Sequence, residues 1–173
     1  MFFKLAGGII IISAAGLMGF LMAGIYVERV RQLRELQYCL NILESEIVHS
    51  STPLVQAFKL VSEKSSKAVS RLFKVMAELL FEKKTDTVAE AFDLAFQALK
   101  RDLYLEREEI DIISSFMQSI GSSDIEGQKK NFNVTVKKLE AFEKKAEEIR
   151  VKNEKLYRYL GICGGALIVI LLV

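Results

Sequence analysis

Few side chains in this sequence combine the types and the spacing that catalysis requires. The chain has one histidine, His49, and Ser45, Ser50 and Ser51 lie close to it. A serine hydrolase is therefore the reaction to consider, yet nearness along the chain supplies neither an oxyanion hole nor an acid that orients the imidazole. We expect no catalytic residue. A membrane-bound hydrolase that uses His49 is the alternative from the enzyme class.

Metal and cofactor sites are not expected either. The two cysteines, Cys39 and Cys163, and the one histidine cannot complete a four-ligand zinc site within one chain. A phosphate-binding loop needs clustered glycines followed by Lys and Ser or Thr, and the polar middle of the chain contains only Gly121 and Gly127. The carboxylates stand among Lys and Arg at helical spacing, as on solvated helix surfaces.

The charge balance argues against nucleic acid as a partner. The chain has 24 Lys and Arg residues against 22 Asp and Glu residues, which gives a net charge of +2. All but one of these charges lie between Glu28 and Tyr159, and the two signs are interspersed there. Binding a phosphate backbone requires a concentrated basic face, so we expect no nucleic-acid partner.

Two apolar segments flank the polar middle region and should position it at a membrane. Residues 5–27 carry no charge, and at about 1.5 Å per residue they reach roughly 34 Å, enough to cross a bilayer core of about 30 Å. Residues 160–173 are also uncharged but reach only about 21 Å, so partial insertion and a buried core helix both stay open for this segment.

The basic residues predict the orientation. Lys4 is the one basic residue before the first apolar run, whereas Arg29, Arg31 and Arg34 follow it. Basic residues favour the cytoplasmic side of a membrane, so the middle region should be cytoplasmic. Small residues favour close packing of membrane helices. The candidate packing positions are Ala15, Gly19 and Ala23 in the first run and Gly161 and Gly165 in the last.

The middle region reads as helical throughout. Apolar residues recur at steps of three and four from Leu33 onward, and Pro53, with the serines before it, breaks the pattern. Thr87 with Glu90, and Ser123 with Glu126, have the spacing of capping boxes. Gly121 should stop the helix before Ser123, and one long helix should then run into the closing apolar segment.

The first and last helices of this region each have a narrow apolar seam, and we expect them to pair as an antiparallel stalk. The fold class predicted is all-α, an antiparallel bundle of about six helices between two membrane helices. The domains are a tail at 1–4, a transmembrane helix at 5–27, a cytoplasmic bundle at 28–159 and a membrane segment at 160–173. The seam residues are Leu33, Leu36, Leu40, Leu43, Ile47, Phe132, Leu139, Phe142, Ile149 and Leu156.

Several stretches resemble the stage III sporulation protein AB family of endospore-forming bacteria. These are MAGIYVERVRQLR at residues 22–34, LESEI at 43–47, TPL at 52–54, and Gly121, Asp124 and Gln128 before the long helix. The resemblance covers essentially the whole chain, and the order and spacing of the stretches carry it. It implies a helical domain similar to the F domain of the type II secretion and type IV pilus inner-membrane platform protein.

The same resemblance implies a function and partners. The family belongs to a channel complex that joins the mother cell and the engulfed forespore, so the expected role is a non-enzymatic scaffold in the mother-cell membrane around the forespore. The implied partners are the other membrane proteins of that channel and a cytoplasmic secretion-type ATPase. Platform proteins carry two such domains, whereas this chain has one, which makes a homo-oligomer an expectation. An inner-membrane adaptor of a general secretion or pilus system is the alternative.

Overall fold

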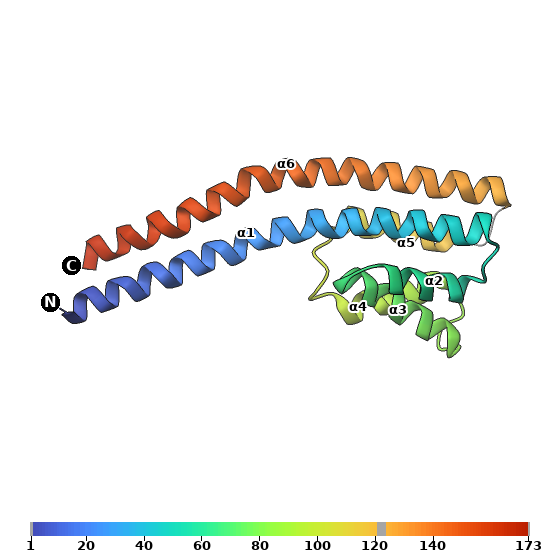
Figure 1. Cartoon of the computed structure of the whole chain (residues 1–173), viewed down its shortest axis with the longest axis horizontal. Coiled ribbons are helices and arrows are strands. Elements are labelled where there is room, and N and C mark those ends of the chain that lie inside the picture. The colour runs from blue at the N-terminus through green and yellow to red at the C-terminus, as the bar shows by residue number, and fades with distance from the viewer. Residues whose placement is uncertain (1, 121–123, 173) are drawn as a thin grey trace. The chain divides into compact units, whose positions relative to one another are not determined.

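The computed structural model describes residues 2–120 and 124–172, and this part of the chain is helical with no strand. Its contacts divide the chain into two units. The terminal unit comprises residues 1–30 and 144–173, and the central unit comprises residues 31–143. Figure 1 shows the elements, which are α1 (Phe2–Glu44), η1 (Ser45–His49), α2 (Leu54–Lys64), α3 (Lys67–Phe81), α4 (Val88–Leu99), α5 (Arg107–Ser119) and α6 (Ile125–Leu172).

The first helix continues from the apolar run into the polar middle without a break, as the sequence predicted. It ends in a π-helical turn, η1, which the periodicity did not indicate. The chain then turns at Ser51, whose φ of 52° is left-handed, and α2 begins after Pro53. Thr52 steadies this turn, because its hydroxyl donates to the Glu46 carboxylate at 3.0 Å.

Helices α2 to α5 pack one after another in the central unit, α2 on α3, α3 on α4 and α4 on α5. Each is amphipathic, and its apolar stripe is buried. Phe58 stacks on Phe73 with ring centroids 6.0 Å apart, and Phe116 meets Phe132 of α6 edge-on at 4.8 Å. These aromatic pairs join neighbouring helices across the core.

Residues of α1 and α6 also meet within the central unit. One oxygen of the Glu143 carboxylate accepts from Arg34 Nε at 2.6 Å, and the other accepts from Gln37 Nε2 at 2.9 Å. A carboxylate that accepts from two side chains of one helix fixes the relative register of the two helices at this point.

A buried glutamine fastens the connection between α4 and α5 to α1. Gln32 is 2% exposed, and its amide donates to the backbone oxygen of Asp102 at 2.8 Å. The same side chain accepts from the backbone N–H of Tyr104 at 2.8 Å. We call this pair of hydrogen bonds the Gln32 clamp. The clamp provides hydrogen-bond partners for the Asp102 oxygen and the Tyr104 N–H, which lie between helices α4 and α5.

The helix starts agree with the sequence in part. Thr87 accepts from the Glu90 N–H at 3.1 Å, but the Glu90 carboxylate accepts from the N–H of Asp86 rather than of Thr87. The Ser123 side of the expected box and the stop at Gly121 lie outside the described residues. At the start of α6, Asp124 accepts from the Gly127 N–H at 3.0 Å.

A further capping box, between Glu106 and Glu109 at the start of α5, was not predicted. Serine, threonine, asparagine and aspartate lead at helix starts, so a glutamate at this position does not indicate a helix start in the sequence.

The predicted seam residues differ in burial. Within the central unit Leu33, Leu36, Leu40, Leu43, Phe132 and Leu139 are at most 1% exposed, whereas Ile47 and Phe142 are half-buried. In the terminal unit Ile149 is half-buried and Leu156 is 49% exposed, so Leu156 departs from the buried seam that its spacing predicted.

The expected packing positions of the apolar ends are described only in part. Gly19 is buried and Ala23 is 2% exposed, whereas the surroundings of Ala15, Gly161 and Gly165 lie outside the described residues. Within the described residues, no helix meets the length and hydropathy required of a membrane span.

Candidate interaction surfaces

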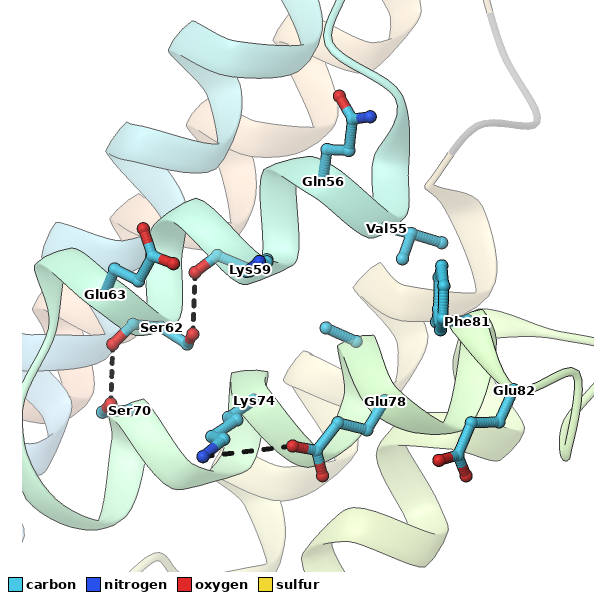
Figure 2. Close-up of a pocket in the computed structure, with 11 residues that line it drawn as sticks. Val55, Gln56, Lys59, Ser62, Glu63, Ser70, Lys74, Glu78, Phe81 and Glu82 are labelled. Carbon is cyan, nitrogen blue, oxygen red and sulfur yellow. Dashed lines mark hydrogen bonds and ion pairs between the residues drawn. The ribbon is translucent and has the colours of Figure 1, made fainter.

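A groove runs between α2 and α3 of the central unit, and Figure 2 shows the residues along it. The two helices pack through Phe58 and Phe73 and are joined by the short turn at Ser65 and Ser66. The groove has a volume of about 730 Å³, which lies in the range of about 300–1,000 Å³ typical of ligand sites. Its lining residues are Val55, Gln56, Lys59, Ser62, Glu63, Ser70, Lys74, Ala77, Glu78, Phe81 and Glu82.

One end of the groove is polar, and its hydroxyl groups are already bonded. Ser62 Oγ donates to the Lys59 backbone oxygen at 2.7 Å, and Ser70 Oγ donates to the Ser62 backbone oxygen at 2.7 Å. The first bond lies within α2, and the second joins the end of α2 to the start of α3. Both hydroxyl hydrogens are therefore used within the protein, which leaves the serine oxygens as acceptors.

The other end of the groove is apolar and open. Phe81 is 78% exposed, and Val55 of α2 lies beside its ring (Figure 2). The backbone turn that follows Phe81 is closed, because the Lys84 N–H donates to the Leu79 oxygen at 2.9 Å and Lys83 takes a φ of 52°. A large exposed aromatic side chain is a feature of binding surfaces.

Carboxylates flank this apolar end. Glu78 lies 4.0 Å from the Lys74 ammonium, and Glu82 lies 2.6 Å from the Lys84 ammonium. The hydrogen bond to Glu82 raises the pKa of Lys84. All four side chains are at least half exposed, and ion pairs in that setting are weak enough to be exchanged for others.

The structure gives no catalytic arrangement to the residues considered from the sequence. His49 is exposed at the end of η1, and Cys39 is buried in α1, where burial raises the pKa of its thiol to about 12. A thiol with that pKa is a poor nucleophile near neutral pH. In the part of the chain that the structure describes, no cluster of three His, Cys, Asp or Glu side chains could hold a metal ion.

A second surface lies on the terminal unit, where large apolar side chains of α1 are turned outward while Gly19 and Ala23 are buried. Water-soluble surfaces rarely expose apolar side chains in such a continuous group. The exposed residues are Leu17, Met18, Phe20, Leu21, Met22, Ile25 and Val27, at 38–69% of their full exposure.

Neither the groove nor the exposed Phe81 was a candidate from the sequence. The groove exists because α2 and α3 lie side by side, and a single sequence does not show which amphipathic helices are neighbours. One signal was present, since Phe81 comes directly before the charged residues Glu82, Lys83 and Lys84 at the end of its helix.

Comparisons with known proteins point to one family. A sequence model of stage III sporulation protein AB matches residues 4–173. A relative from Bacillus subtilis (strain 168), named stage III sporulation protein AB, is 34% identical over 169 residues, which is 98% of each chain. A solved structure of a stage III sporulation protein AB is 30% identical, with a TM-score of 0.66 over 72% of this chain and 98% of the other. These names describe a sporulation protein, and none of them names an enzyme.

Proposed function

The chain belongs to the stage III sporulation protein AB family, and we propose that it is a non-enzymatic scaffold anchored in the mother-cell membrane around the forespore. In this role the terminal unit is held in lipid, and the central unit lies on the cytoplasmic side. The central unit offers its surfaces to the other membrane proteins of the mother cell to forespore channel and to a secretion-type ATPase. Force from the ATPase is anchored or transmitted through the helical bundle.

The outward-facing apolar side chains of α1 are the observation that carries the proposal. Leu17, Phe20 and Leu21 are 60–69% exposed, whereas Gly19 and Ala23 are buried. In water the large side chains would be buried, because burial gains about 25 cal/mol per Å² of apolar surface. Lipid removes that driving force and leaves close contact between small residues as the stabilising interaction.

The basic residues that follow this surface support the cytoplasmic placement. Arg29 and Arg31 lie two and four residues after Val27, and Arg34 follows one turn later. Three arginines on one side of an apolar run, against Lys4 alone on the other, have the asymmetry that keeps a flanking region in the cytoplasm.

Extraction of membranes tests the anchoring. After sporulation is induced, membranes that contain the full chain are washed at alkaline pH and then solubilised in detergent. We expect the chain in the pellet after the wash and in the supernatant only with detergent. Release by the alkaline wash alone would overturn the anchoring.

Labelling of cysteines placed near Met1, near Thr85 and after residue 170 tests the orientation. We expect the cysteine near Thr85 to react with a membrane-impermeant maleimide only after the cells are opened.

Co-purification tests the partner claim. The full-length chain is solubilised in mild detergent and captured by a tag, and the bound fraction is examined for the ATPase and the channel proteins. We expect at least one of them at a level above that captured by an unrelated membrane protein with the same tag. Their absence, from a preparation in which the chain is folded and abundant, would remove the partner claim and leave the anchoring intact.

A further inference from the structure

A second exposed surface of the central unit complements the open end of the groove. On α6, Val134 is 43% exposed, and it stands one helical turn from Lys130, Lys137 and Lys138, all of them exposed. Positions three and four residues apart lie on one helix face, so three lysines neighbour this valine on the same face of α6. We call Val134 and these lysines the basic face of α6.

The basic face stands out against the charge of its own unit. Residues 129–138 contain four lysines and no acidic residue. The central unit as a whole has 16 basic and 18 acidic residues, so the remainder holds 12 basic residues against 18 acidic ones. A locally positive helix face on a unit that is otherwise negative attracts the negative surface of another copy.

The open end of the groove has the matching properties. Its apolar part is Phe81 with Val55, and carboxylates at Glu78 and Glu82 flank it. Those carboxylates already bind lysines of their own chain, but the pairs are exposed and exchange at little cost. Both surfaces are exposed in the folded central unit, so they can meet only between two copies.

We propose that the basic face of α6 in one copy docks into the α2–α3 groove of a second copy. Val134 covers Phe81 in this contact, and the lysines lie beside Glu78 and Glu82. The two surfaces are different, so the contact is heterologous and leaves each copy with one free groove and one free face. Repetition builds a ring or a filament, which goes beyond the proposed anchoring role and does not depend on it.

Photocrosslinking from the groove tests the contact without removing its aromatic anchor. Phe81 is replaced by the photoreactive amino acid p-benzoylphenylalanine in a full-length chain with one tag, and a second full-length chain with another tag is co-expressed. Trypsin cleaves after Lys130 and after Lys137, so Val134 lies in the peptide 131–137. We expect an adduct between the probe and this peptide of the other chain.

The same probe at Leu94, which is 49% exposed on α4, is the matched control. An adduct of the Phe81 probe with a different protein, with another peptide of this chain, or at no more than the level of the Leu94 probe would overturn the proposal.

Charge exchange tests the electrostatic part. The double substitution Glu78→Lys and Glu82→Lys in the probe chain should lower the adduct yield by roughly tenfold, the effect of two lost exposed ion pairs. Lys137→Glu with Lys138→Glu in the other chain should do the same, and the adduct is then read on the tryptic peptide 131–144, because these substitutions remove the cleavage sites after residues 137 and 138. Combining both sets should restore the yield, which a mere folding defect would not do; a yield that stays low in the combination would refute the charge pairing. These outcomes are read from adducts alone, so they are independent of membrane extraction and of co-purified partners.

Discussion

Breaking the Gln32 clamp should loosen the central unit by an amount that its geometry sets. The substitution Gln32→Leu keeps most of the side-chain volume but removes both bonds, to the Asp102 oxygen and from the Tyr104 N–H, each 2.8 Å long. A backbone group left without a partner costs about 1–3 kcal/mol when buried. Both bonds are part-buried, so the lower part of that range applies to each of the two groups. The expected loss is about 2–3 kcal/mol in total.

Alkylation of Cys39 measures this loss in the full-length chain. Cys39 is fully buried in the central unit, and the pKa of its thiol is raised to about 12, mainly by burial. Near pH 8 the folded state therefore holds almost no thiolate, and labelling proceeds through opening of the unit. Cys163→Ser removes the other thiol. With about 1.4 kcal/mol per factor of ten, Gln32→Leu should speed the labelling by roughly 30- to 150-fold.

Gln118→Leu is the matched control, because Gln118 is exposed on α5 and the same atoms are exchanged. It should change the labelling rate by no more than about twofold, as for most surface substitutions. A labelling rate that rises linearly with reagent concentration verifies that opening is in rapid equilibrium. If Gln32→Leu and Gln118→Leu label at the same rate, the clamp does not stabilise the unit.

Other perturbations have equally direct readouts. Thr85→Val should slow Cys39 labelling by up to about tenfold, because Thr85 Oγ1 is buried without a partner in the described structure and valine has nearly the same shape; faster labelling would contradict this. The pKa of the Cys39 thiol is about 12 in the folded state, against an ordinary 9.0. The neutral thiol therefore makes its full contribution to the free energy of unfolding below about pH 9, and this contribution declines as the pH rises toward 12. Cys39→Ala should therefore flatten the rise in protease sensitivity between pH 9 and 10.5. His49→Ala should leave spore yield and protein level unchanged, since His49 is exposed at the end of η1; lost sporulation with normal protein abundance would favour the hydrolase alternative.

The helices could be predicted because their signals are local. Apolar residues at steps of three and four mark the buried stripe, and Leu33, Leu36 and Leu40 are indeed at most 1% exposed. Pro53 cannot continue a helix and stands at the start of α2, as expected. Such signals need only a residue and its neighbours within one or two turns.

The tertiary contacts and the exposure of single side chains depend on partners that are distant in the sequence. Gln32 binds backbone groups 70 and 72 residues away, and a glutamine at such a position reads as surface in the sequence. Phe81 is a large apolar residue at the end of α3, yet it is 78% exposed. Periodicity gives the face on which a residue lies but not what covers that face, and Leu156 departs from its expected burial for the same reason.

Helix α1 has two opposite patterns of side-chain burial along its length. Toward its start, Gly19 and Ala23 are buried and Phe20 and Leu21 are exposed, whereas toward its end Leu33 and Leu36 are buried. Aqueous burial selects large apolar side chains for the interior, and lipid makes no such selection. The pattern changes between residues 27 and 30, which is also where the first arginine, Arg29, occurs. Burial and charge thus favour one boundary independently, and this agreement supports a membrane surface at that level of α1 in the proposed role.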